Sequence, residues 1–184
     1  MATLTIELRA GTEQTAFNLH RWSELLEDAE LGRELARFRG RIETDRHGHI
    51  IMYPPPGYAH GGFQAEIAHQ LRDLLPAGRV TTECPVSTAD GVKGVDVTWV
   101  SDRLRMEIDA GVFLSRAPEI CVEVISPSNT RREMAEKKAL FFAAGATEVW
   151  FCAEDGRMTF FLSAASRGAK SSRLCPAFPG SIKF

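Results

Sequence analysis

The feature that most restricts how this chain can fold is a short apolar run followed at once by an amphipathic helix. Residues 120–125 (ICVEVI) are apolar on both faces apart from Glu123, a pattern typical of a central strand that is covered on both sides. A helix is predicted over residues 130–144, and Thr130 with Glu133 has the spacing of a capping box at its start. The connection is so short that the helix must fold back beside the strand.

Strands and helices alternate along the rest of the chain, with a predicted hairpin at each end. Apolar spacing predicts further helices over residues 23–38, with Gly32 as a candidate break, and over 61–75. Strand patterns lie at 4–8, 41–44, 49–53, 79–83, 95–100, 148–153 and 158–162. We therefore expect an α/β fold with a mixed central β-sheet flanked by helices. The length of 184 residues fits a single domain, with residues 163–184 as a loop and tail.

A net charge of −2 separates this chain from proteins that hold nucleic acid mainly by bulk positive charge. Any contact with nucleic acid then requires a local basic patch. Arg37, Arg41 and Arg131 are the candidates for phosphate contacts. The same arginines are equally compatible with ordinary solvated positions.

The rest of the composition is that of a globular protein in a reducing compartment. The fractions of 44% hydrophobic and 25% charged residues are ordinary, and no window reaches the roughly 18 apolar residues of a membrane span. The first residues lack the pattern of a secretion signal. The four cysteines are widely spaced, which favours buried thiols over zinc ligands or disulfides. We expect a cytoplasmic location and no association with membranes.

Three charged residues break the local pattern of their segments. Asp96 interrupts a strand-forming run and Glu123 interrupts the central strand. Lys137 falls inside the apolar stripe of the predicted 130–144 helix. Each residue has an ordinary alternative: an aspartate in a turn, a glutamate paired with an arginine, and a lysine whose amine reaches solvent.

The three positions support one another, because the helix that carries Lys137 must lie near the strand that carries Glu123. A buried lysine would compensate the charge of the carboxylates, and a divalent cation would compensate it further. Two carboxylates, a hard cation such as Mg²⁺ and one lysine are a known solution to phosphodiester hydrolysis. Spacing alone leads only to a buried ion cluster with a metal as one option.

The same residues carry a resemblance to a known family. The segments RIETDRHGHIIMYPPPG, QAEI, GVDVTWV and PEICVEVISPSNTRREMAEKKALFFAAGATEVWF resemble the Uma-type family of bacterial endonucleases. That family is part of the PD-(D/E)xK restriction-endonuclease-like superfamily. The resemblance covers about residues 17–162, and its most specific part runs from EVISPS to TEVW. It implies a restriction-endonuclease-like core.

The resemblance assigns motif roles to individual positions. Asp96 matches the motif aspartate and Glu123 matches the (D/E) position. Val95 stands in place of the motif proline, and Ile125 stands where the motif lysine is expected. The resemblance implies that this lysine has moved to the following helix, at Lys137.

Further residues are matched with less specific parts of the pattern. Glu66 resembles the acidic residue of the superfamily's first helix and would be an additional metal ligand. Glu43 matches a recurrent family glutamate and would be an auxiliary acidic residue. His60 fits an ordinary helix-start histidine better than a phosphate contact.

The resemblance implies a metal-dependent endonuclease that hydrolyses DNA. Asp96, Glu123 and Glu66 would hold Mg²⁺ or Mn²⁺, and Asp96, Glu123 and Lys137 would form the catalytic set. A homodimer is also expected, because cutting both strands favours a second active site. Two alternatives stay open: a non-catalytic nucleic-acid-binding or assembly module on the same fold, and a metal-dependent phosphohydrolase that acts on small substrates.

Overall fold

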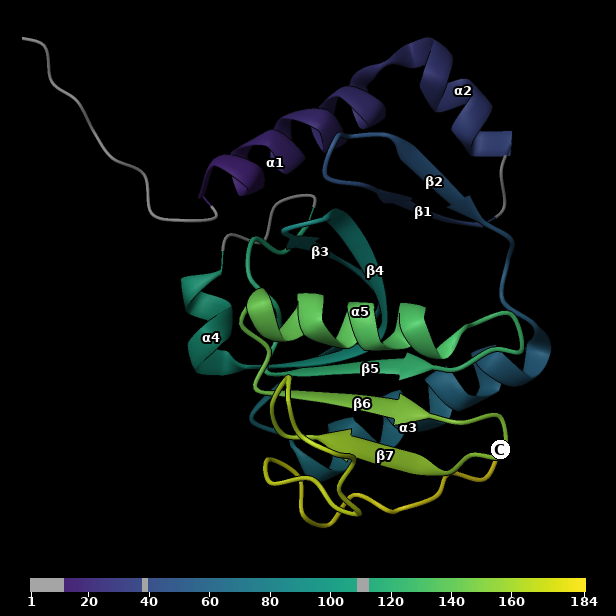
Figure 1. Ribbon diagram of the computed structural model, residues 1–184, viewed down its shortest axis with the longest axis vertical. Coiled ribbons are helices and arrows are strands. Elements are labelled where there is room, and N and C mark those ends of the chain that lie inside the picture. The colour runs from purple at the N-terminus through teal and green to yellow at the C-terminus, as the bar shows by residue number, and fades with distance from the viewer. Residues whose placement is uncertain (1–11, 38–39, 109–112) are drawn as a thin grey trace, which may run out of the picture.

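The computed structural model describes residues 12–37, 40–108 and 113–184, and its centre is a five-stranded mixed sheet (Figure 1). The strand order is β3-β4-β5-β6-β7, and β1 and β2 form a separate antiparallel pair. The strands are β1 (Arg41–Thr44), β2 (Ile50–Tyr53), β3 (Gly78–Thr88), β4 (Gly91–Ser101), β5 (Ile120–Val124), β6 (Glu148–Cys152) and β7 (Met158–Phe161). The strand predicted over residues 4–8 lies outside the described residues.

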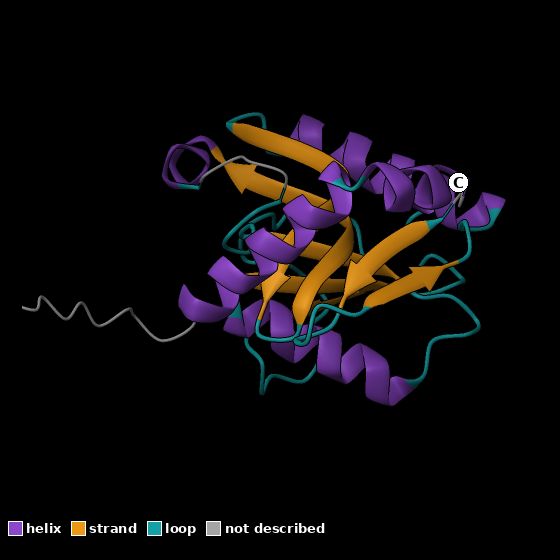
Figure 2. Cartoon of the chain, turned by 90° about the horizontal axis from the view of Figure 1, so that it is seen from above, coloured by secondary structure: helices purple, strands orange, loops and turns teal. Residues whose placement is uncertain are grey.

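Helices cover both faces of this sheet (Figures 1 and 2). They are α1 (Thr12–Glu27), α2 (Ala29–Arg37), α3 (Tyr58–Leu74), α4 (Asp102–Glu107) and α5 (Arg131–Ala143). The predicted α/β class, the mixed sheet flanked by helices and the hairpins near both ends are therefore confirmed. Within the described ranges, none of the helices has the length and apolar character that crossing a bilayer requires.

The alternation of side chains along β5 explains how two apolar cores form. Val122 packs with α3 on one face, together with residues of β4 and β6. Cys121 points to the other face and packs with Met134 and Phe141 of α5. Because α5 connects β5 to β6, which pair in parallel, it crosses the sheet and lies over the face that Glu123 shares with Cys121.

The helical region before β1 differs from the sequence prediction. One helix over residues 23–38 with a break at Gly32 is wrong, because two helices are present and Gly32 lies inside the second. The break falls at Asp28, whose carboxylate accepts hydrogen bonds from the backbone N–H groups of Glu30 (2.9 Å) and Leu31 (2.8 Å). Such a carboxylate cap starts a new helix and outweighs the weak helix-breaking tendency of one glycine.

The β3–β4 hairpin is longer than the predicted strands 79–83 and 95–100. Its turn lies at Ala89 and Asp90, with Gly91 at φ +86°, and pairing continues from Thr88↔Gly91 to Gly78↔Ser101. A Cβ atom at Gly91 would collide with the carbonyl oxygen of Thr44, so glycine also allows β1 to lie close to this turn.

The chain after β7 is tied to the sheet by a buried glutamate. The carboxylate of Glu148 accepts hydrogen bonds from Trp150 Nε1 (2.7 Å) and from the backbone N–H groups of Arg173 (2.7 Å) and Leu174 (2.9 Å). Three donors satisfy this buried group, and the two backbone donors hold residues 173–174 at the start of β6.

Candidate active site

The candidate site lies where β4 and β5 separate. Their antiparallel pairing runs from Trp99↔Ile120 to Val97↔Val122, and one further step of this register brings Asp96 opposite Glu123. The backbone pairing of β4 with β5 stops at Val97↔Val122. Beyond it, the Asp96 carboxylate accepts a hydrogen bond from the backbone N–H of Val124 at 2.7 Å. The divergence leaves room for side-chain carboxylates between the strands. Asp96 and Glu123 are only 1% and 3% exposed.

Asp96 is held ionised by cationic neighbours. Burial by itself would raise its pKa, but hydrogen bonding to His60 and the charge of Arg41 lower it below its ordinary value. His60 Nε2 lies 3.3 Å from Asp96 Oδ2, and Arg41 Nη1 lies 2.8 Å from Asp96 Oδ1. The same hydrogen bond to Asp96 raises the pKa of His60, so this contact favours an imidazolium–carboxylate pair.

Glu123 pairs with the lysine that the helical phase singles out. Lys137 Nζ donates a hydrogen bond to Glu123 Oε2 at 2.8 Å. Burial nevertheless raises the pKa of Glu123 to about 7, and the charge of Lys137 offsets only part of this rise. The other carboxylate oxygen, Oε1, is buried and has no hydrogen-bond partner among the residues that the structure describes. An orphaned acceptor of this kind is costly in a folded protein.

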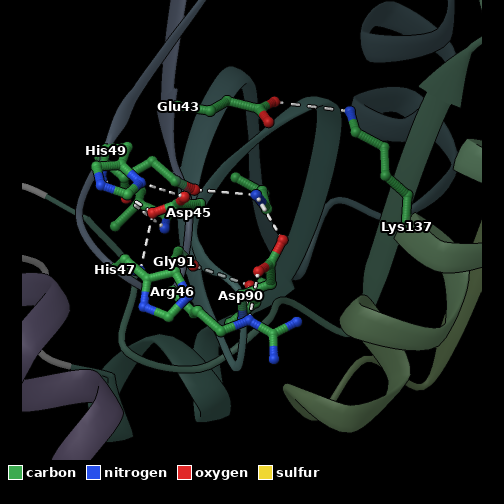
Figure 3. Close-up of polar contacts among 12 residues, drawn as sticks. Glu43, Asp45, Arg46, His47, His49, Asp90, Gly91 and Lys137 are labelled. Atoms are coloured by element: carbon green, nitrogen blue, oxygen red, sulfur yellow. Dashed lines mark hydrogen bonds and ion pairs between the residues drawn. The ribbon is translucent and has the colours of Figure 1, made fainter.

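Glu43 of β1 is a third buried carboxylate at the site. Its Oε1 atom lies 3.7 Å from Lys137 Nζ, the contact drawn in Figure 3, and accepts a hydrogen bond from the backbone N–H of Gly94 at 3.2 Å. Thr44, next to it, accepts from Lys93 Nζ and from the backbone N–H of Val92, so β1 is fixed against β4. The side chain of Glu43 is only 1% exposed.

Two residues that were not predicted from the sequence as metal ligands lie close to Asp96. His60, Glu83 and Asp96 each offer one ligand atom, and these atoms lie within 4.8 Å of one another. Glu83 lies opposite Asp96 in the register of the hairpin, between the pairs Thr82↔Val97 and Cys84↔Val95. Its φ of +51° is a left-handed conformation that a non-glycine residue adopts only under strain.

Glu66 and two of the proposed phosphate-binding arginines lie elsewhere. Glu66 is on α3 and accepts a hydrogen bond from Gln70 at 2.7 Å; it is not in the group of His60, Glu83 and Asp96. Arg37 and Arg131 are exposed, at the end of α2 and the start of α5. Arg41 instead points into the carboxylates.

The chemistry of these side chains suits a hard divalent cation. Carboxylate oxygens are the preferred ligands of Mg²⁺, and Mn²⁺ accepts carboxylates together with an imidazole. Two observations fit such an ion: Glu123 Oε1 has no partner among the described residues, and the ligand atoms of His60, Glu83 and Asp96 lie close together. Glu123 is not itself in that group of three. The site therefore brings the buried carboxyl groups of Asp96 and Glu123 together with the ammonium group of Lys137.

Comparisons with known proteins agree with this architecture. Residues 29–179 match the Uma2 family, which is described as "Putative restriction endonuclease". Among solved structures, a "putative nuclease belonging to DUF820" from Anabaena variabilis superposes with a TM-score of 0.59 at 15% sequence identity. The match covers 70% of this chain and 74% of that one, and at this identity it is a likeness of fold. No curated protein matches the sequence.

Proposed function

This chain belongs to the Uma2 family, and on that premise we propose that it is a metal-dependent endonuclease that hydrolyses DNA phosphodiester bonds. The observation that carries the proposal is the buried Oε1 of Glu123, which has no hydrogen-bond partner among the described residues and comes from the strand next to that of Asp96. A protein has little reason to keep an unpaired carboxylate oxygen next to a second buried carboxylate unless a cation binds there.

Asp96 and Glu123 are the proposed metal ligands from the two diverging strands, and Glu83 is a candidate to complete the set. His60 is a further candidate, but it would have to release its ring proton before it could bind a metal ion. A bound Mg²⁺ or Mn²⁺ ion would neutralise phosphate charge and lower the pKa of a nearby water molecule. The Asp96 carboxylate is oriented by the Val124 N–H before any ligand arrives. This preorganisation avoids an ordering cost when the ion binds.

Lys137 has the position of a group that acts on the phosphate. Burial alone would lower its pKa, but the charges of Glu123 and Glu43 raise it above the ordinary value, so the amine carries its proton. Its side chain is 17% exposed, so Lys137 is not fully closed off from solvent. There it can orient the attacking water and stabilise negative charge that develops on the phosphoryl oxygens.

Plasmid nicking by matched aspartate variants tests the proposal. Wild-type protein should nick supercoiled plasmid in Mg²⁺ or Mn²⁺ and stop when EDTA is added. Asp96→Asn should reduce the rate by at least about a hundredfold, because it removes a charged ligand. Asp90→Asn is the control and should leave nicking unchanged, because Asp90 lies in the β3–β4 turn, where it pairs with Arg46 (Figure 3).

Two results would refute this function. Nicking that survives both EDTA and Asp96→Asn would exclude the proposed metal centre. Wild-type protein that binds Mn²⁺ and hydrolyses bis(p-nitrophenyl) phosphate but leaves plasmid intact would exclude DNA as the substrate.

Sedimentation velocity on the same samples tests the proposed homodimer, which predicts a mass of about twice 20.3 kDa.

A further inference from the structure

Arg41 occupies a position that the proposed hydrolysis does not require. Its Nη1 atom lies 2.8 Å from Asp96 Oδ1 and 3.9 Å from Glu83 Oε2, and its Nε atom lies 3.4 Å from Glu43 Oε1. The guanidinium therefore contacts two of the three residues that could hold a metal ion together. A permanent cation already lies against the ligands that a divalent cation would use.

The surroundings of Arg41 are shaped for this placement. A Cβ atom at Gly94 would lie 2.5 Å from Arg41 Cδ, so the absence of a side chain on β4 gives the arginine stem its path. The guanidinium carbon lies 5.4 Å from the centre of the Tyr53 ring, which is 36% exposed. Arg41 thus lies between the carboxylates and a partly exposed aromatic ring.

The guanidinium is held by charge more than by directed hydrogen bonds. Its Nη1 atom donates to Asp96, but Nε is buried and has no hydrogen-bond partner among the described residues, despite its nearness to Glu43. A bidentate arginine–carboxylate pair would use both nitrogens. An arginine whose Nε donates to no described residue is easier to displace than one that binds a carboxylate through two nitrogens.

We infer that Arg41 is a built-in counter-ion that competes with the divalent cation for Asp96 and Glu83. Without metal it neutralises the carboxylates and keeps the folded protein stable. A metal ion held by the same carboxylates would repel the guanidinium, so metal binding weakens the contact between Arg41 and Asp96. The inference deepens the proposed function and rests on its metal site.

Mn²⁺ titration by calorimetry on wild type and Arg41→Gln tests this competition. The variant should bind Mn²⁺ at least about tenfold more tightly, because a positive charge next to the ligands is removed. Its metal-free melting temperature should fall, and saturating Mn²⁺ should raise that temperature more than it does in wild type. Gly94→Ala is the second variant, for use if Arg41→Gln does not fold. It keeps the positive charge but displaces the stem of Arg41, and should also tighten Mn²⁺ binding.

Arg46→Gln is the matched control, because Arg46 pairs with Asp90 at 3.3 Å in the turns and should not alter Mn²⁺ affinity. Equal or weaker Mn²⁺ binding by Arg41→Gln and Gly94→Ala, with wild type binding normally, would overturn the counter-ion role alone. Absence of Mn²⁺ binding in wild type and in both variants would overturn the metal site of the proposed function, and the counter-ion role with it.

Discussion

Lys137 and Lys138 are neighbours on α5 whose ammonium groups lie in different surroundings. Lys137 donates to Glu123, whereas Lys138 Nζ lies 4.5 Å from the centre of the Phe161 ring on the edge strand β7. We predict that Lys137→Gln lowers plasmid nicking by about a hundredfold or more, because an ammonium is lost from the charge that stabilises the phosphoryl group. Gel quantification of nicking rates gives the comparison.

Lys138→Gln is the control for this prediction and should nick at the wild-type rate. Mn²⁺ binding should survive in both variants, since neither lysine is a ligand. Equal nicking by both variants would remove Lys137 from the reaction.

The raised pKa of Glu123 makes the stability of the metal-free protein depend on pH. Burial moves this pKa from 4.5 to about 7, so the folded state holds a proton that the unfolded state releases. The stabilisation is complete below about pH 4.5 and is lost as the pH rises through 7. Glu123→Gln cannot titrate, so wild type should lose up to about 3 kcal/mol relative to the variant across that window.

Urea unfolding of both proteins in EDTA, at several pH values from 4.5 to 8, measures this difference. The hydrogen bond to Asp96 raises the pKa of His60, but His60 is present in both proteins, so the comparison subtracts its contribution. A wild type that gains stability relative to Glu123→Gln as the pH rises would show that Glu123 is better compensated than its burial indicates.

At the scale of the element, the start of α5 determines where Lys137 lies. Thr130 accepts a hydrogen bond from the Glu133 backbone N–H, and the Glu133 carboxylate accepts one from the Thr130 N–H, which completes the predicted capping box. Thr130→Ala should lower the free energy of unfolding by about 1 kcal/mol. Thr147 is an exposed threonine before β6, and Thr147→Ala should change the free energy of unfolding little. Chemical denaturation that shows equal losses would argue against the cap.

The elements that were predicted correctly are those whose signals are local. The strand at 120–125 follows from its apolar run, and α5 follows from its cap and stripe. Their proximity follows from the short connection, which is why Glu123 and Lys137 could be matched before the contact was known. Asp96 was identified because aspartate is disfavoured inside a strand-forming run.

The missed residues depend on a register that those patterns do not contain. Glu83 reaches Asp96 only because the β3–β4 turn falls at Ala89 and Asp90. The sequence does hold a signal for that turn, because Asp90-Gly91 is a favoured hairpin dipeptide. His60 was visible as a helix-start residue, but its contact with Asp96 depends on how α3 packs on the sheet, which is a tertiary property.

At the scale of the whole molecule, the fold brings charged residues from distant parts of the chain into one place. Glu43 comes from the β1–β2 pair, Asp96 and Glu123 come from adjacent strands, and Lys137 comes from the helix above them. A net charge of −2 offers little general attraction to DNA, so the proposed activity depends on this site and on exposed arginines such as Arg131.

The central claim is that the buried carboxylates are assembled to hold a divalent cation. Mn²⁺ calorimetry on wild type and Asp96→Asn tests it most directly. We predict saturable binding to wild type at about millimolar ion concentrations or below, and loss of that binding in a folded Asp96→Asn protein. A wild type that shows no binding heat, or an Asp96→Asn variant that binds as tightly as wild type, would contradict the claim.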